Sequence, residues 1–214
     1  MARTKLRRLQ KINELTNVFN SKDPDIKAKM KNYFNSAMIS TLEIGCGHGD
    51  YIVEFAQKSP EKKFLGIDVK GARIFQGAIK AMELNLRNIA FWLTKAENLP
   101  QIITPKSIEE IYVLFPEPHQ KRSKQNRRLM TVPLIKLYKE LLMDSGQLHF
   151  KTDNLDLYEY ALKNIVELEG KIIHTTKDLH SAEQLKIDSG VLTNFEKYYI
   201  NEGRKIKYIC SSFN

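Results

Sequence analysis

From residue 40 onward, short apolar runs alternate with amphipathic segments. Each run is rich in Ile, Val, Leu and aromatic residues and ends near Gly, Pro or Asp, which is typical of buried strands. In the intervening segments, apolar residues recur with the helical period of about 3.6 residues. We expect strands over 41–45, 62–68, 88–93, 108–115, 146–152, 170–176 and 205–212, and helices over 51–58, 71–84, 132–142 and 155–168.

This alternation predicts an α/β fold with a doubly wound, mostly parallel sheet and helices on both faces. Residues 37–214 are long enough to bury one core, so we expect a single domain there. Residues 1–36 are polar and basic, and we expect a partly disordered arm. Within this arm, 11–19 (KINELTNVF) and 25–34 (DIKAKMKNYF) have helical potential.

Charge adds a candidate partner to this picture. The chain has 34 Lys and Arg against 25 Asp and Glu, a formal net charge of +9. The cations gather in two clusters, one before Glu14 and one over 121–128, which favours a polyanion such as nucleic acid or acidic lipid.

Several classes of protein are disfavoured by what the sequence lacks. No apolar run approaches the roughly 20 residues of a membrane span, and the N-terminus has no apolar signal segment. Cys46 and Cys210 belong to no CxxC pattern, and the five histidines show no metal-ligand spacing. We expect a cytoplasmic protein that holds no metal and binds no membrane.

Three glycines follow the first predicted strand in LEIGCGHGDY. Gly45, Gly47 and Gly49 lie where that strand turns into a helix, and glycines there let a ligand approach the backbone and the helix N-terminus. The spacing is GxGxG and differs from the GxGxxG of dinucleotide-binding folds. A tight turn without a ligand is an equal alternative.

Two acids lie close to this loop in the predicted fold. Asp68 ends the second strand in FLGID, where an acid can accept both hydroxyls of a ribose. Glu43 lies inside an apolar strand, so we expect a cationic or N–H partner for it, either the ammonium of an amino-acid-like ligand or the loop's own amides. Together the loop and the acids resemble Rossmann-like S-adenosylmethionine-dependent methyltransferases more than dehydrogenases.

The stretch FPEPHQKRSKQNRR, 115–128, places one carboxylate, Glu117, between two prolines. The prolines restrict the backbone and so fix the direction of this side chain. The cations that follow include Lys121, Arg127 and Arg128, and they are expected to engage phosphates. A solvated basic loop is the alternative.

Two further stretches combine candidate binding residues with helix-capping patterns. LHFKTDN ends the fifth strand with polar residues, of which Asp153 or Asn154 can cap the next helix and leave the others for a site. Thr193 and Glu196 have the spacing of a capping box, for which a structural role is the simpler interpretation.

In this order, LEIGCGHGDY, FLGID, FPEPHQKRSKQNRRL, LHFKTDN and LTNFEKYYINEG resemble the bacterial tRNA (guanine-N7-)-methyltransferase family. The resemblance covers about 42–203. It implies a Rossmann-like class I methyltransferase fold and methyl transfer from S-adenosylmethionine to N7 of a guanine in the tRNA variable loop. The site residues that it implies are Glu43, Gly45, Gly47, Asp68, Lys95 and Glu117 for the cofactor, Glu117 for catalysis, and Lys121, Asp153, Thr193 and Glu196 for tRNA, beside Arg127 and Arg128 from the basic run.

Three positions depart from the family pattern. Glu117 stands where the family usually has Asp, and His119 where it usually has Trp. Lys95-Ala96 replaces an Asp-Ala pair whose acid lies by the adenine of the cofactor, so either Glu97 or the backbone must take over that contact. A catalytically weak or inactive RNA-binding protein on the same fold is therefore the main alternative, and a small-molecule methyltransferase is another. Both a monomer and a homodimer fit the sequence.

Overall fold

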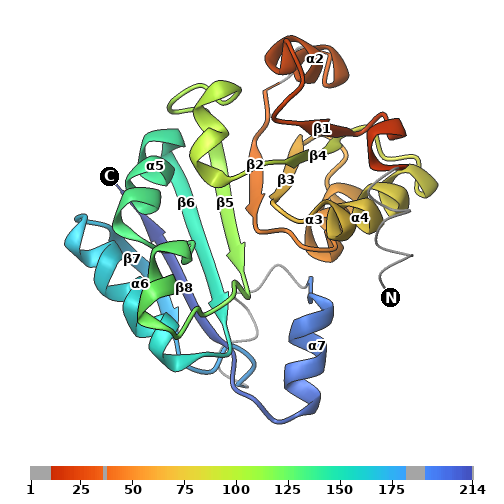
Figure 1. Cartoon of the computed structure of the whole chain (residues 1–214). Coiled ribbons are helices and arrows are strands. Elements are labelled where there is room, and N and C mark those ends of the chain that lie inside the picture. Colours follow the sequence, from red (N-terminus) through yellow and green to blue (C-terminus); the bar gives the residue numbers. More distant parts are fainter. Residues whose placement is uncertain (1–10, 36–37, 182–190, 214) are drawn as a thin grey trace.

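The computed structural model describes residues 11–35, 38–181 and 191–213, and Figure 1 shows them as one layered α/β domain. The described residues form an eight-stranded sheet with the order β1-β4-β3-β2-β5-β6-β8-β7. Strand β8 is antiparallel to both of its neighbours, and the other pairs are parallel. The strands are β1 (Val18–Asn20), β2 (Thr41–Ile44), β3 (Phe64–Asp68), β4 (Ile89–Leu93), β5 (Ile108–Leu114), β6 (Leu142–Thr152), β7 (Lys171–Thr176) and β8 (Lys207–Ser212).

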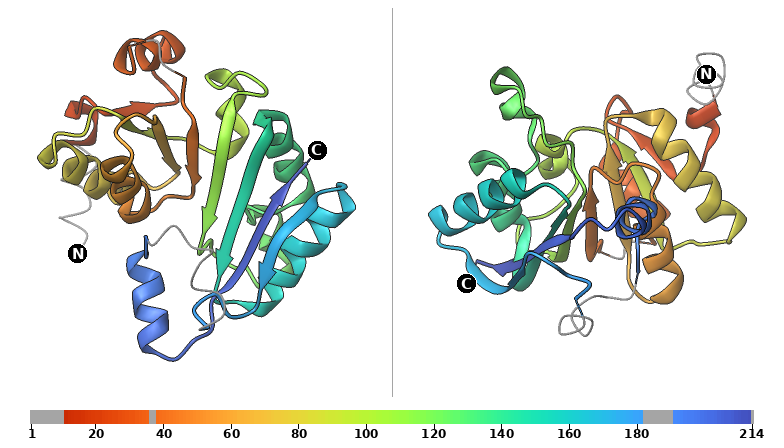
Figure 2. Two further views of the ribbon diagram at one scale, coloured as in Figure 1. Left: turned by 180° about the vertical axis from the view of Figure 1, so that it is seen from behind. Right: turned by 90° about the horizontal axis from the view of Figure 1, so that it is seen from below.

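Helices cover both faces of this sheet, as Figure 2 shows from behind and from below. One face packs against α3 and α4, and the other packs against α2, α5 and α6. A further helix, α7, stands at the edge toward which β5 and β6 point (Figure 1). The helices are α2 (Ile26–Tyr33), α3 (Asp50–Lys58), α4 (Gly71–Glu83), α5 (Val132–Leu141), α6 (Leu155–Glu167) and α7 (Asn194–Asn201), with short 3-10 helices η1 (Ile12–Glu14), η2 (Ala96–Gln101) and η3 (Arg122–Arg127).

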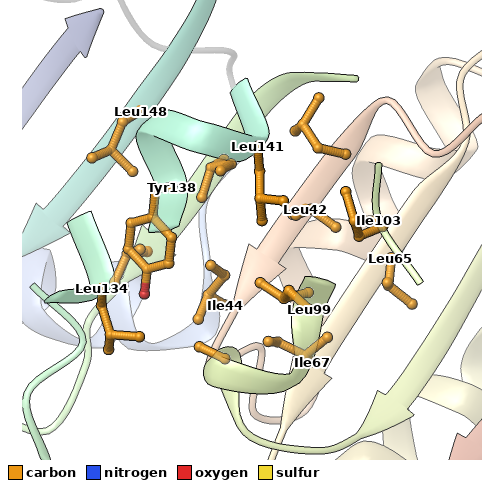
Figure 3. Packing of buried hydrophobic residues seen from close by; sticks show 14 of the residues in the cluster. Leu42, Ile44, Leu65, Ile67, Leu99, Ile103, Leu134, Tyr138, Leu141 and Leu148 are labelled. Carbon is orange, nitrogen blue, oxygen red and sulfur yellow. The ribbon is translucent and has the colours of Figure 1, made fainter. Parts of the chain in front are cut away.

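The larger core lies between the sheet and α5. Leu42 and Ile44 of β2 pack with Leu134 and Tyr138 of α5, as Figure 3 shows. Because side chains alternate along a strand, the residue between them, Glu43, faces the other side of the sheet. Burial of each Leu or Ile contributes about 1.5–3 kcal/mol, so this layer fixes the strands whose ends carry the site.

The predicted fold class is confirmed, and the strands and helices expected from residue 40 onward all occur with small shifts at their ends. The helix expected within 25–34 is also confirmed as α2. The helical expectation for 11–19 is wrong over its second half: Val18–Asn20 forms β1, which pairs with β4 (Val18 opposite Phe91). The exposed edge of β4 offers backbone partners that outweigh a weak helical propensity.

Part of the expected N-terminal arm contributes to the core. Phe19, Ile26, Met30 and Phe34 are buried in the larger cluster. The division into an arm over 1–36 and a domain over 37–214 stays a prediction, and residues 1–10 lie outside the described residues. Within the described ranges, no helix is long and apolar enough to cross a membrane.

Candidate active site

The site lies where the strand order reverses, beyond the carboxyl ends of β2, β3 and β5. Strand β2 pairs with β3 on one side and with β5 on the other. The connection from β2 leads to β3 on one side, and the connection from β4 leads to β5 on the other side of β2. Ligands of open α/β sheets bind in the crevice that results at such a point. The glycines and Glu117 lie in the loops that follow β2 and β5, and Asp68 ends β3, so the fold gathers candidates that are distant in sequence.

The glycine loop after β2 is held against β3 and is open at one position. The backbone N–H groups of Gly45 and Cys46 both donate to the carbonyl of Ile67, at 2.8 and 2.9 Å. Gly47 has a φ of +56°, in the left-handed region that favours glycine, and a Cβ added there would meet nothing within 4 Å. The backbone at Gly47 therefore borders open space that a ligand can enter.

Asp68 joins the glycine loop to the end of β3. Its Oδ2 accepts a hydrogen bond from the Gly47 N–H at 3.0 Å, and its Oδ1 accepts one from the Lys70 N–H at 2.8 Å. Each carboxylate oxygen has two lone pairs, so both oxygens can still accept from hydroxyls of a ligand. This geometry suits the predicted ribose contact.

Glu43 is buried beneath the same loop. Its Oε2 accepts a hydrogen bond from the Ile52 N–H in the first turn of α3, at 3.1 Å. The pKa of Glu43 is raised to about 8, mainly because the carboxyl is buried; the hydrogen bond from the Ile52 N–H lowers the pKa, and the nearby acids Asp50 and Asp68 raise it. Such a carboxyl gains most from a cationic group placed beside it, which suits the ammonium of an amino-acid-like ligand.

Lys95 lies at the start of η2, with its side chain exposed. The residue before it, Thr94, donates its backbone N–H to the Asp68 carbonyl at 3.1 Å. The backbone here is therefore tied to the ribose end of the candidate cofactor site. A cofactor contact by Lys95 stays a prediction. The position favours a contact through the backbone over one through a side chain.

Glu117 lies in a turn that is held from two sides. The N–H of Phe115 donates to the Lys151 carbonyl of β6 at 2.9 Å, and Arg128 Nε donates to the Pro118 carbonyl at 2.9 Å. Phe115 itself has a φ of +47°, an uncommon conformation for an aromatic residue that marks a sharp reversal at the end of β5. The turn projects the Glu117 carboxylate away from the core.

The carboxylate of Glu117 is exposed and lies near two cations and one imidazole. Lys70 Nζ lies 2.5 Å from its Oε1, Arg73 Nη2 lies 4.0 Å from the same oxygen, and His119 Nε2 lies 3.9 Å from Oε2. The hydrogen bond from Lys70 is the main reason why the pKa of Glu117 is lowered. Glu117 is therefore ionised at neutral pH.

Lys70 and Arg73 are site residues that were missed from the sequence. They follow the strand-end acid in DVKGAR and lie at the start of α4. The sequence indicates a site role for them only through their place after a strand, because the loops that follow parallel strands lie at the same edge of the sheet. In a chain with 34 Lys and Arg, two more cations carry little information by themselves.

The basic run divides into exposed and buried members. Lys121, Lys124 and Arg127 are exposed on or beside η3. Arg128 is buried, and its guanidinium lies over the ring of Tyr160 at 4.6 Å. The phosphate contacts predicted for Lys121 and Arg127 suit their exposure. The contact predicted for Arg128 stays a prediction, and its bonds here instead hold the turn that carries Glu117.

Asp153 lies at the end of β6 and is ion-paired. Its Oδ2 is 3.0 Å from Arg204 Nη1, and its carbonyl accepts from Lys207 Nζ at 2.9 Å. The next residue, Asn154, caps α6 by accepting from the Leu157 N–H at 2.8 Å. The capping role is thus taken by Asn154, which leaves the partly exposed Asp153 carboxylate at the site edge.

Thr193 and Glu196 both face inward. Thr193 caps α7 by accepting from the Glu196 N–H at 2.9 Å. The Glu196 carboxylate is completely buried and lies 3.2 Å from Lys151 Nζ and 2.8 Å from His180 Nε2. Contacts of these two side chains with tRNA stay predictions, and in this arrangement both side chains serve the docking of α7.

Among the described residues, no group of three or more His, Cys, Asp or Glu is placed to hold a metal.

Comparison with known proteins agrees with this geometry. The family model described as "Putative methyltransferase" matches residues 37–209. A tRNA (guanine-N(7)-)-methyltransferase of Cytophaga hutchinsonii is 34% identical over 218 residues, which cover 100% of this chain and 99% of that protein.

Solved structures share the fold at low sequence identity. A 16S rRNA methyltransferase, KamB, superposes with a TM-score of 0.68 at 13% identity, over 92% of this chain and 99% of that chain. A mutant 16S rRNA adenine methyltransferase of Catenulisporales acidiphilia, solved with its cosubstrate SAM, gives 0.59 at 14% identity, over 89% and 92%. By its matched family model and its full-length relative, this chain belongs to the tRNA (guanine-N7-)-methyltransferase family of enzymes, and it has the fold of S-adenosylmethionine-dependent methyltransferases.

Proposed function

We propose that this enzyme transfers a methyl group from S-adenosylmethionine to N7 of a guanine in the variable loop of tRNA. The observation that carries the proposal is Glu117, an ionised and exposed carboxylate in a turn held by hydrogen bonds from two sides and paired with Lys70 next to Asp68. Relatives that bear the name tRNA (guanine-N(7)-)-methyltransferase support the choice of reaction and of RNA. Cytoplasmic location and either a monomeric or a homodimeric state stay predictions.

The residues around the glycine loop suit the methyl donor. Asp68 would accept the ribose hydroxyls, Gly47 would let the donor approach the backbone, and Glu43 would face the ammonium group. The backbone at Lys95 and Ala96 would lie by the adenine. When bound, S-adenosylmethionine supplies a methyl group on a positively charged sulfur, which takes the electron pair of the bond that breaks.

The role of the chain in the reaction is alignment and electrostatics. Guanine N7 carries an in-plane lone pair and no proton, so no general base is needed, and the gain comes from holding the nucleophile in line. The purine becomes positively charged as its new bond forms. The Glu117 carboxylate would stabilise that charge where it develops, or would accept from the N–H edge of the base. Asp153 is a second candidate for the base edge.

Affinity for tRNA would come from the exposed cations of the turn and of η3. Lys121, Lys124 and Arg127 can contact phosphates, which position an RNA without reading its sequence. Lys70 and Arg73 add positive charge on the other side of Glu117. Because such contacts release counterions, binding should weaken steeply as salt is added.

The proposal is tested by methylation of an unmodified tRNA transcript with the purified protein and isotopically labelled S-adenosylmethionine. Nuclease fragments are mapped by mass spectrometry. We expect one methyl group per tRNA, at N7 of a variable-loop guanine. A transcript with 7-deazaguanine at that position is the matched control and should accept no label. Label at another atom, or binding of tRNA without any transfer, would refute the assignment.

A further inference from the structure

Helix α7 turns its polar capping residues inward and two large aromatic residues outward. Thr193 and Glu196 are buried. By contrast, Phe195 is 52% exposed and Tyr198 is 55% exposed. Residues three apart lie on the same side of a helix, so these two rings share one surface. The helix therefore presents aromatic side chains to its surroundings at the edge of the active site.

The outward rings belong to a connected aromatic group. The Tyr199 ring lies 6.3 Å from Phe195, with an angle of 28° between the planes, and 5.6 Å from Tyr198, at 61°. On its other side, Tyr199 lies 5.7 Å from the ring of Phe115. Phe115 begins the turn that carries Glu117 two residues later. The group thus runs from the catalytic turn to the exposed surface of α7. We name Phe195, Tyr198 and Tyr199 the α7 aromatic face.

Two cations, one of them paired with two carboxylates, border this face. The Arg204 guanidinium lies over the Tyr199 ring at 4.9 Å and is paired with Asp153 and Glu202, at 3.0 and 2.9 Å. Lys197 on α7 is exposed. Aromatic rings beside an exposed cation such as Lys197 match a nucleotide, whose base stacks on the rings while its phosphate meets the cation.

Exposure of two adjacent large aromatic residues needs a reason in a folded protein. Contiguous exposed apolar surface marks interaction sites. Folding alone would not favour it, because the inward contacts of α7 are already supplied by the cap and by the pair of Glu196 with Lys151. An aromatic face next to a nucleic-acid site is suited to unpaired bases, because every base has a flat apolar surface.

We propose that the α7 aromatic face stacks an unpaired base adjacent to the target guanine in tRNA. This inference rests on the proposed function and names the part of the enzyme that accommodates the distorted RNA. A base that reacts must leave its stack, and its neighbour then loses a stacking partner. The α7 aromatic face replaces that partner at the edge of the same site.

The direct test uses 2-aminopurine placed next to the target guanine in a tRNA transcript. Stacking on an aromatic ring quenches this fluorophore, so we expect the complex with the wild-type enzyme to fluoresce less than the complex with Phe195→Ala/Tyr198→Ala. Because a stacked base is lost, we expect the variant to bind tRNA about fivefold to a hundredfold more weakly. Phe195→Trp/Tyr198→Phe, which keeps the rings, should behave like the wild type.

Salt dependence separates stacking from charge. The alanine variant should keep the wild-type slope of binding against salt, whereas Arg127→Ala should flatten it, because only the second change removes a phosphate contact. Val166→Ala, on exposed α6 surface, controls for loss of apolar area in general, and circular dichroism checks that each variant is folded.

Two failures can be told apart. If the wild type transfers no methyl group to tRNA, the proposed function is wrong. If the wild type methylates tRNA while the alanine variant shows unchanged fluorescence and affinity, the α7 aromatic face binds no base and the inference is overturned.

Discussion

Two lysine–glutamate ion pairs lie at the same edge of the sheet and differ in their exposure to solvent. In the pair of Lys151 with Glu196, the side chains are 2% and 0% exposed, and the charged atoms are 3.2 Å apart. In the pair of Lys70 with Glu117, the side chains are 47% and 54% exposed, and the atoms are 2.5 Å apart. The shorter contact is thus the one that water reaches.

This difference in exposure distinguishes a pair that stabilises the fold from a pair whose carboxylate is available to a substrate. Both charges of a buried pair have lost their hydration, so neither can leave without a large cost. Lys151 and Glu196 therefore fix α7 to β6. Water can replace either partner of an exposed pair, and such pairs contribute about 0–1 kcal/mol to stability. Glu117 can consequently exchange Lys70 for a substrate at little cost, which suits a carboxylate that acts on a base.

Removal of one partner of the buried pair should have the largest effect on stability. Lys151→Met leaves the buried Glu196 carboxylate with His180 but without its lysine partner. We expect the free energy of unfolding, measured by urea denaturation, to fall by about 3–5 kcal/mol. Lys151→Met/Glu196→Met should recover much of this loss, because neither charge then remains. Lys106→Met, which breaks the exposed pair with Asp144, is the control. Equal losses in the two single variants would contradict the contrast between the pairs.

Glu43 extends the comparison to a buried carboxyl whose neighbours include two other acids. Because the folded protein holds the Glu43 proton more tightly than the unfolded chain does, ionisation disfavours the folded state. The free energy of unfolding should therefore fall as pH rises from about 4.5 to about 8, the ordinary and the raised pKa values, with a contribution of about 3 kcal/mol accumulated by pH 7.

Glu43→Gln tests this dependence, because it removes the ionisation and keeps an oxygen for the Ile52 N–H. The free energy of unfolding of the variant should depend less on pH, and it should rise relative to that of the wild type as pH rises. Glu54→Gln, at the surface of α3, provides the matched control. Parallel profiles for the wild type and Glu43→Gln would mean that the pKa of Glu43 is not raised.

A smaller effect is expected from the exposed pair. Lys70→Ala should change the free energy of unfolding by no more than about 1 kcal/mol. Removal of this cation raises the pKa of Glu117, because Lys70 is the main cause of its lowering. The acid limb of methyl transfer should then move to higher pH, as a profile of kcat/KM against pH would reveal. Lys177→Ala, in the exposed pair with Glu159, should leave that limb in place. A Lys70→Ala profile that matches the wild type would exclude an influence of Lys70 on the group that sets the acid limb.

Strands and helices with a long apolar pattern could be predicted from the sequence. Strands such as Phe64–Asp68 and helices such as Gly71–Glu83 have a clear period and clear ends, and both occur as predicted. Strand β1 has only three residues, which is too short to show a period. Its pairing with β4 depends on a strand edge about 70 residues away along the chain, which local propensity does not encode.

The site was only partly predictable for a related reason. Asp68 and Glu117 have distinctive local settings, a strand end and a pair of flanking prolines. The burial of Glu196 depends on Lys151, which is 45 residues earlier in the chain, and the capping spacing at Thr193 did not indicate which side chains face inward. The role of Lys70 likewise depends on a carboxylate 47 residues later. Partners at such separations become visible only in the folded chain.

The central claim is that Glu117 serves the reaction and contributes little to the fold. The most direct test is the single-turnover rate of methyl transfer to tRNA by Glu117→Ala, measured together with its affinity for S-adenosylmethionine and its free energy of unfolding. We predict a loss of methyl transfer of about a hundredfold or more, typical of the removal of one electrostatic contact to a transition state, with a smaller loss of cofactor affinity and nearly unchanged stability. A single-turnover rate equal to that of the wild type would contradict the claim.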